Sequence, residues 1–249
     1  MVITTSWDDG YPSDRRLADL LDKYGMAATF YLPRRSQRET LQCTEIKDLS
    51  SRFEIGAHTL DHLDLTTLDP ARAKDQICDS KHWLESLLGT SCNLFCPPMG
   101  KFTRQHVEMI QQCGYLGFRT VEMGSIRRPV CETPPIELTT TIQVHPHHPV
   151  AYLKNALRRR RVGATLAALR LLAQPDWRRR ANGYLREAIP RGGVFHLWGH
   201  SWEIDDNHQW QPLELLLQDL EKLVMSGDAV VRTNGQLAKW IASQSGDVK

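Results

Sequence analysis

Two aspartates and two histidines in the first quarter of the chain have the residue types and the spacing of a hydrolytic metal site. Asp8 and Asp9 end a β-branched segment that reads as a strand, and His58 and His62 follow a second such segment. Two imidazoles and one carboxylate on a divalent metal leave open positions for water and substrate. Adjacent strand residues point to opposite faces, and Gly10 permits a sharp turn, so the two carboxylates can take different roles. One of them is then free to accept a proton from the attacking water.

Two segments around these residues resemble motifs of the NodB-like polysaccharide deacetylases, carbohydrate esterase family 4. Thr5–Gly10 resembles the first motif of the family, and Gly56–His62 matches its second motif. The resemblance implies that Asp8 is the catalytic base. It also implies a divalent metal held by Asp9, His58 and His62. Zinc is the expected ion, with cobalt, nickel and iron as alternatives, because ligand type defines such a site more than the metal does.

A third motif of the family is partly present at Phe95–Gly100, with Cys96 where the family has an arginine. The resemblance implies that the backbone N–H of Met99 helps to hold the oxyanion, and a backbone donor survives changes of side chain. The family arginine braces the catalytic aspartate. Arg119, on a strand-like segment further along, is the candidate to replace it, with an ion pair to a surface acid as the alternative.

The segment Gly193–Glu203 resembles the fifth motif of the family, an apolar strand that ends in Leu-x-His, with Trp198 in place of the leucine. The resemblance implies that His200 is the general acid that protonates the leaving amine. His196 has the same strand parity and is the alternative. His200 is favoured because it stands at the end of the strand, where the chemistry of barrel enzymes gathers.

The fourth motif of the family is absent, so Glu203 or Glu122 is the candidate to orient the acid. The expected activity is hydrolysis of an N-acetyl or N-formyl group from a sugar, in the biosynthesis of bacterial surface polysaccharide, lipopolysaccharide or O-antigen. The missing motif and the cysteine at position 96 keep one alternative open, a hydrolase of a linear or cyclic amide that is not a sugar. A carbohydrate-binding protein with a decayed site is the other alternative, and the intact metal ligands speak against it.

Composition allows this interpretation. The chain has 249 residues, 41% of them hydrophobic and 24% charged, which suits one α/β barrel domain spanning residues 1–249. No signal peptide or membrane-spanning stretch is visible, so a cytoplasmic location with reduced thiols is expected. The six cysteines form no Cys-x-x-Cys pair, although Cys92 and Cys96 are alternative metal ligands.

Strand and helix signals alternate along the chain. Helices are expected at residues 13–25, 70–88, 103–113 and 211–225, and further strands at 27–32 and 229–233. Ser13 and Thr103 are the expected N-caps of the first and third of these helices. Such alternation favours a parallel sheet with helices outside it. The family resemblance implies a distorted, incomplete (β/α) barrel of about seven strands.

Residues 151–191 form an expected helical insertion with a strong positive charge. Eleven Lys and Arg residues stand there against Asp176 and Glu187, a net charge of +9. Such a segment suits an anionic substrate, for example a nucleotide-linked or lipid-diphosphate-linked sugar or an acidic polysaccharide. Contact with an anionic membrane surface and a plain solvated helix pair are the alternatives. Nucleic acid is not expected as a partner, because no aromatic stacking pattern accompanies the arginines. The oligomeric state is not predicted.

Overall fold

The computed structural model describes residues 1–129, 134–147 and 176–245. The strands in this part are β1 (Val2–Asp8), β2 (Ala28–Leu32), β3 (Glu54–Ala57), β4 (Leu94–Phe95), β5 (Gly117–Arg119), β6 (Ile136–Leu138), β7 (Ile142–Gln143), β8 (Val194–His200) and β9 (Val230–Val231). The α-helices are α1 (Asp14–Lys23), α2 (Cys43–Arg52), α3 (Pro70–Leu88), α4 (Arg104–Gln112), α7 (Trp177–Ala188), α8 (Ser201–Asp206), α9 (Trp210–Met225) and α10 (Asn234–Ser245).

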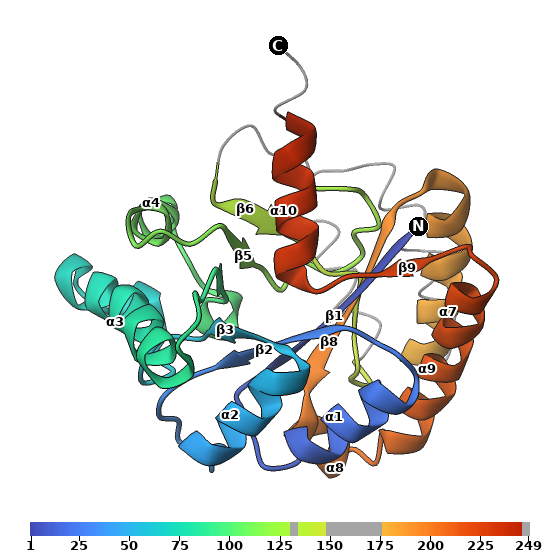
Figure 1. Ribbon diagram of the computed structural model, residues 1–249, viewed down its shortest axis with the longest axis horizontal. Coiled ribbons are helices and arrows are strands. Elements are labelled where there is room, and N and C mark those ends of the chain that lie inside the picture. The colour runs from blue at the N-terminus through green and yellow to red at the C-terminus, as the bar shows by residue number, and fades with distance from the viewer. Residues whose placement is uncertain (130–133, 148–175, 246–249) are drawn as a thin grey trace.

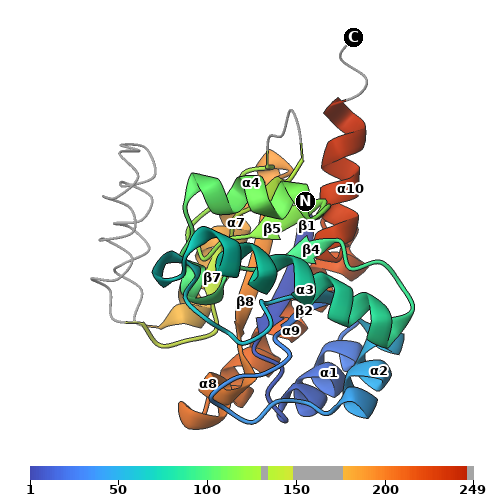
Figure 2. The ribbon, with the colours of Figure 1, turned by 90° about the vertical axis from the view of Figure 1, so that its left-hand side faces the viewer.

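The strands form one curled parallel sheet with helices around it. Their order is β6-β5-β4-β3-β2-β1-β8-β7, and β9 pairs with β1. Helices α3 and α4 cover one side of the sheet and α7 and α9 the opposite side (Figure 1), and the view turned by 90° places α3 and α4 in front of the strands (Figure 2). The two end strands, β6 and β7, are not paired with each other in the described residues. The predicted distorted, incomplete (β/α) barrel is confirmed, with β6 and β7 as strands that the sequence did not predict.

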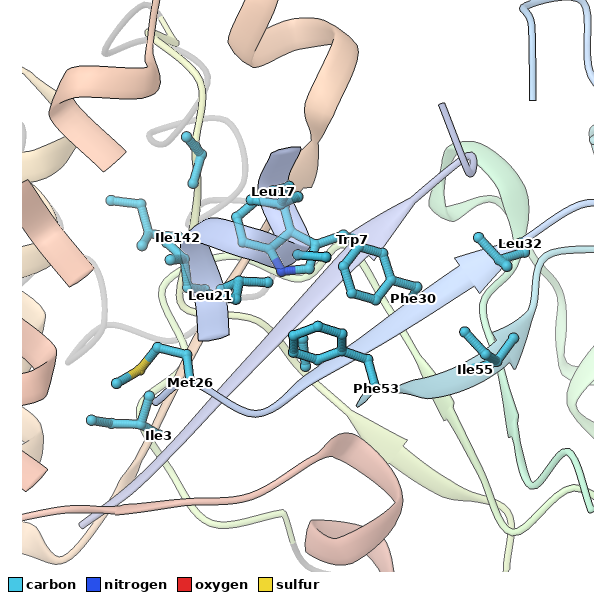
Figure 3. Close-up of a cluster of buried hydrophobic side chains, with 14 of the residues drawn as sticks. Ile3, Trp7, Leu17, Leu21, Met26, Phe30, Leu32, Phe53, Ile55 and Ile142 are labelled. Carbon is cyan, nitrogen blue, oxygen red and sulfur yellow. The ribbon is translucent and has the colours of Figure 1, made fainter. Parts of the chain in front are cut away.

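Two apolar clusters hold the sheet. The larger one lies between the strands and the outer helices, where Trp7 and Phe30 pack near Leu17 and Leu21 of α1 (Figure 3). The smaller one lies inside the curl and includes residues at the beginnings of β1, β4, β6 and β8 together with Leu237 of α10. Because α10 covers the ends at which the strands begin, the opposite, carboxyl ends remain for a site.

Side-chain caps begin some of the helices but not all. Asp69 caps α3 by accepting a hydrogen bond from the backbone N–H of Arg72, and α3 ends at Gly89 in the left-handed conformation. Thr103 caps α4 as predicted. The prediction that Ser13 caps the first helix is wrong, because its side chain makes no capping hydrogen bond and its hydroxyl donates to Asp205 instead.

The expectation of reduced cysteines is also wrong in part. Cys78 on α3 and Cys113, directly after α4, form a disulfide. Cys43, Cys92 and Cys96 are free, and the remaining cysteine lies outside the described residues. The pair is 35 residues apart in sequence, so only the packing of α3 against α4 brings the two thiols together.

Of the predicted basic insertion, residues 151–175 lie outside the described part of the chain. The described remainder forms α7, which packs on α9 and β8, with Trp177 buried. Arg178 forms an ion pair with Asp219 of α9, and Arg191 forms one with Glu187. This part of the insertion therefore has much of its charge paired on the outside of the sheet. No helix among the described residues is long and apolar enough to cross a membrane.

Candidate metal and catalytic site

The register of the sheet brings residues that are distant in sequence to one edge. Asp8, the last residue of β1, lies opposite His200, the last residue of β8. Ala57, the last residue of β3, lies opposite Leu32, the last residue of β2. Residues that follow these strand ends therefore lie at the same level. The carboxyl edge of the sheet gathers the polar side chains that the sequence singled out.

Asp9, His58 and His62 converge on one point at this edge. The Nε2 atoms of His58 and His62 lie 3.5 and 3.1 Å from Oδ1 of Asp9. One ligand atom of each residue lies within 4.8 Å of the other two. Asp9 and His58 are buried, whereas the His62 side chain is 21% exposed. The three predicted metal ligands are thus together, with access from the side of His62.

The donor atoms of this cluster suit a divalent cation. Oδ1 of Asp9 is buried and accepts no hydrogen bond from the described residues. Burial raises the pKa of Asp9, but interactions with His58 and His62 and the charge of His200 outweigh burial and hold this pKa well below its usual range. Nδ1 of His58 lies 2.6 Å from the carbonyl oxygen of Cys96, to which it donates. Nε2 of His58 therefore presents its lone pair to the cluster, as a metal ligand requires.

The backbone around the cluster is strained. Asp9, Thr59, His62 and Met99 have φ angles of 80°, 64°, 51° and 58°, and only one other non-glycine residue of the described chain has a positive φ. Such conformations are uncommon for residues with a side chain and gather at functional sites. Asp9 contacts His58, His62 and Trp202, whereas Asp8 contacts Arg119. The two neighbouring carboxylates do have different surroundings, as the sequence predicted.

Trp202, two residues after His200, contacts the metal cluster. The sequence did not predict this contact. Its indole N–H donates a hydrogen bond of 2.9 Å to Oδ2 of Asp9. This contact orients the carboxylate so that Oδ1 faces the two imidazoles. Partners of this kind are often as necessary to a metal site as the ligands themselves.

Trp202→Phe is expected to weaken metal binding by about 10- to 100-fold, because the hydrogen bond that orients Asp9 is lost while the ring remains. A competition titration against a chelator of known affinity measures the change. Trp210→Phe is the matched control, since the indole of Trp210 donates to Asp205 and not to the cluster. Equal metal affinity in the two variants would contradict this role of Trp202.

Asp8 and Arg119 form a buried ion pair. Nη2 of Arg119 donates to Oδ1 of Asp8, and the Arg119 side chain is completely buried. The guanidinium carbon lies 5.3 and 4.7 Å from the ring centroids of Tyr31 and Trp198, which flank it. Burial lowers the pKa of Arg119, but the charge of Asp8 outweighs burial and keeps the guanidinium protonated. The surface ion pair considered as the alternative for Arg119 is wrong.

His200 faces the same edge and is held by Glu203. Nδ1 of His200 lies 2.6 Å from Oε2 of Glu203, and its Nε2 lies 3.8 Å from Oδ2 of Asp8. Glu203 also accepts a hydrogen bond of 2.7 Å from Gln143, and its Oε1 lies 3.3 Å from Nδ1 of His145. Burial lowers the pKa of His200, but the hydrogen bond to Glu203 and the charges of the two aspartates outweigh burial and raise the pKa to about 9.

The protein without metal is expected to lose stability as the pH rises from 6.5 to about 9. The pKa of His200 is about 9 in the fold against an ordinary 6.5, so its protonation stabilises the fold fully below pH 6.5. That contribution, about 3 kcal/mol, is lost as the pH rises through the folded pKa. Urea unfolding at several pH values measures it. Glu203→Gln should flatten the profile and Glu122→Gln should leave it unchanged, and the opposite pattern would overturn the pairing of His200 with Glu203.

The alternative residues for these positions have other surroundings. His196 is buried inside the curl, with its ring nitrogens 2.9 Å from Ser6 Oγ and 3.0 Å from the Thr139 carbonyl. Burial lowers the pKa of His196 to about 3, so it is neutral. The backbone N–H of Glu122 donates to the hydroxyl of Thr120, and its backbone carbonyl oxygen accepts from the hydroxyl of Thr140.

The two free cysteines on either side of β4, Cys92 and Cys96, also have distinct surroundings. Cys92 contacts backbone carbonyl oxygens, and burial raises its pKa to about 12, so it presents no thiolate. Cys96 has its thiol near Asp8 and His58, in a second possible cluster. Burial raises the pKa of Cys96 well above its usual range, which disfavours the thiolate that a metal needs. In the loop after β4, Met99 is 56% exposed.

A family model of polysaccharide deacetylases matches residues 1–118 of this chain. The matched segment includes four residues at the edge of the sheet, Asp8, Asp9, His58 and His62. It also includes Met99 in the loop after β4. Arg119, His200 and Glu203 lie beyond its end. The family match therefore does not cover the second half of the site.

Two proteins of known sequence illustrate the similarity. YxkH of Bacillus subtilis, whose name assigns it to the polysaccharide deacetylases, is 28% identical over 130 residues, which cover 51% of this chain and 47% of that protein. A chitin deacetylase of Pestalotiopsis is 29% identical over 119 residues, covering 47% of this chain and 39% of that protein. The aligned part of the chain thus spans less than half the length of each relative.

Solved structures match over nearly the whole chain. A Mycobacterium smegmatis protein assigned to the polysaccharide deacetylases superposes with a TM-score of 0.70 at 14% identity, covering 98% of this chain and 90% of that one. The chitin deacetylase of Colletotrichum lindemuthianum has a TM-score of 0.60 at 15% identity, covering 95% of this chain and 86% of that one. At these identities the similarity establishes the fold.

Proposed function

We propose, from the match of residues 1–118 to a family model of polysaccharide deacetylases, that the protein is a metal-dependent hydrolase that removes an N-acetyl or N-formyl group from an amino sugar. Deacetylase chemistry is supported at the level of the family. The observation that carries the finer proposal is the convergence of Asp9, His58 and His62 beside the Asp8–Arg119 pair and the His200–Glu203 pair.

Asp9, His58 and His62 would hold the metal, with zinc as the expected ion. A divalent ion in this place supplies Lewis-acid polarisation of the acyl oxygen and lowers the pKa of a water. Asp8 is the proposed general base, which accepts the proton of the attacking water. Arg119 donates to one oxygen of Asp8, Oδ1, so the other oxygen, Oδ2, remains for the proton.

His200 is the proposed general acid. Since Glu203 accepts from its Nδ1, the proton on Nε2 is directed toward Asp8 and the metal cluster, where the leaving amine must depart. The backbone N–H of Met99 is the proposed donor to the oxyanion. Proton transfer then balances, because Asp8 gains one proton in the attack and His200 gives one to the amine.

Hydrolysis of a non-sugar amide and a decayed binding site are the competing functions. The first was favoured by the two departures from the family motifs, the missing fourth motif and Cys96. The structure pairs Arg119 with Asp8, for which the family arginine is missing, and Glu203 with His200, for which the fourth motif is missing. These two pairs support an intact sugar hydrolase.

The place of this reaction in bacterial surface polysaccharide, lipopolysaccharide or O-antigen biosynthesis stays a prediction from the sequence, as does the cytoplasmic location. A nucleotide-linked or lipid-diphosphate-linked sugar as substrate, and contact with a membrane surface through residues 151–191, stay predictions too. The disulfide between Cys78 and Cys113 counts against the argument from reduced thiols, because disulfides persist mainly in oxidising compartments.

The test is amine release by the zinc-loaded protein from N-acetyl and N-formyl amino sugars, beside ring opening of a cyclic imide, measured by the carboxylate that it forms. We expect turnover of at least one acylated sugar, loss of that turnover with a chelator, and recovery when zinc is restored. Turnover of the imide alone would replace the proposed substrate class. Sugar turnover that a chelator does not affect would refute the metal dependence.

A further inference from the structure

The loop between β2 and α2, residues 33–42, forms one wall of the site. The backbone N–H of Leu41 donates to the carbonyl oxygen of Gly10 at 2.7 Å, directly after the two aspartates. The backbone N–H of Arg35 donates to the carbonyl oxygen of Leu60 at 2.8 Å, between the two histidines. The loop is therefore fixed to both halves of the metal cluster.

Arg38 of this loop is held over the cluster by an aromatic ring. Its guanidinium carbon lies 3.9 Å from the centroid of the Trp202 ring. The same indole donates its N–H to Oδ2 of Asp9 at 2.9 Å. One side chain thus separates the guanidinium from a proposed metal ligand. Stacking occupies the face of a guanidinium and leaves the N–H groups along its edge free to bind a planar or tetrahedral oxyanion.

The positive charge at this wall is not neutralised by the described part of the protein. Arg35 pairs with Asp61 at 2.7 Å. Arg34 and Arg38 are exposed and form no ion pair with any described acid, including Glu39 of the same loop. Arg52, which stacks on Phe53, has acidic partners in Asp19 and Asp22. Arg38 has no acidic partner among the described residues, and it lies against the ring that contacts Asp9.

We propose that the substrate carries an oxyanion group, phosphate or carboxylate, near its acylated amine, and that Arg38, supported on Trp202, binds this group. The inference rests on the proposed function and specifies its substrate class. Arginine binds both kinds of oxyanion with paired, charge-assisted hydrogen bonds. The alternative is that Arg38 only covers the indole ring, in which case substrate charge has no effect.

The experiment compares three substrates of the zinc-loaded protein at low ionic strength. They are the neutral methyl glycoside of N-acetylglucosamine, N-acetylglucosamine 1-phosphate and an N-acetylated amino-uronic acid. We expect at least one charged substrate to exceed the neutral one in kcat/KM by about tenfold or more, and Arg38→Gln to reduce that ratio by about tenfold or more. The charged substrate that responds identifies phosphate or carboxylate as the group. An unchanged ratio in Arg38→Gln would overturn the proposal.

Arg16→Gln is the matched control, because Arg16 is exposed and stacks 4.1 Å over Trp210, away from the cluster. Its ratio should equal that of the unmutated protein. Arg38→Lys keeps the charge but not the paired N–H groups, so its ratio should fall between those of the unmutated protein and Arg38→Gln.

Calorimetric binding of the same three sugars separates this proposal from the function on which it rests. If a charged sugar binds more tightly than the neutral one, if Arg38→Gln removes this difference, and if no sugar is turned over, the oxyanion site is supported and the hydrolase is refuted. Turnover of the neutral and charged sugars with equal efficiency would support the hydrolase and refute the oxyanion site.

Discussion

Asp8→Asn is expected to reduce kcat by about 10²- to 10⁴-fold while the protein keeps its metal. Asp8 is buried, accepts from Arg119 through Oδ1 and presents Oδ2 at 3.8 Å from Nε2 of His200. It is the carboxylate beside the metal cluster that is not one of the three converging ligands Asp9, His58 and His62. Asparagine has a similar shape but cannot accept the proton of the attacking water. The loss should therefore appear in kcat and not in metal content.

The measurement is amine release at saturating substrate, with zinc content determined on the same sample. Asp22→Asn is a matched control, since Asp22 pairs with Arg52 at 2.5 Å on the surface and should have no effect on turnover. A kcat of Asp8→Asn within tenfold of the unmutated value would remove Asp8 from the role of base. Loss of zinc together with turnover would make Asp8 part of the metal site instead.

Arg119→Leu is expected to destabilise the fold by about 3–5 kcal/mol, because it leaves the carboxylate of Asp8 buried without its partner. Arg119 is completely buried between Tyr31 and Trp198, so solvent cannot replace the lost ion pair. The free energy of unfolding in urea, measured on the metal-free protein, gives the cost. On the surface, Arg52→Leu should cost about 1 kcal/mol or less.

The double variant Asp8→Asn/Arg119→Leu distinguishes a broken pair from lost packing. If the cost of Arg119→Leu comes from the uncompensated charge of Asp8, the double variant should be more stable than the sum of the two single changes predicts, by 1 kcal/mol or more, roughly. Strictly additive costs would mean that Arg119 stabilises the protein through its contacts with the two rings and that Asp8 does not depend on it.

The first half of the site could be predicted because its residues lie in short, contiguous motifs. Asp8 and Asp9 are adjacent, and His58 and His62 share one loop, so a local pattern carries their spacing. His200 could be predicted because it ends a long apolar strand, and the parallel pairing of β1 with β8 places it beside Asp8. Asp8 and His200 are 192 positions apart, but each ends its strand and the two strands are parallel, so the sequence was enough to place them together.

The remaining contacts depend on packing that no local pattern records. Trp202 belongs to a six-residue helix, and its indole reaches Asp9 from 193 positions away. Gln143 lies on the two-residue strand β7, which is too short for an alternating pattern to appear. The bond between Cys78 and Cys113 depends on the docking of two helices that were each predicted without their partner. Arg119 was a candidate only because the position at Cys96 had lost its arginine.

Metal content, determined by elemental analysis beside amine release, tests the central claim most directly. The comparison is between the unmutated protein and the double variant Asp9→Asn/His58→Ala, both purified in the same way and reconstituted with zinc. The account predicts about one metal ion per chain and release of amine from an acylated sugar in the unmutated protein, and neither in the variant. An unmutated protein that binds no metal after reconstitution, or a variant that keeps both metal and turnover, would contradict it.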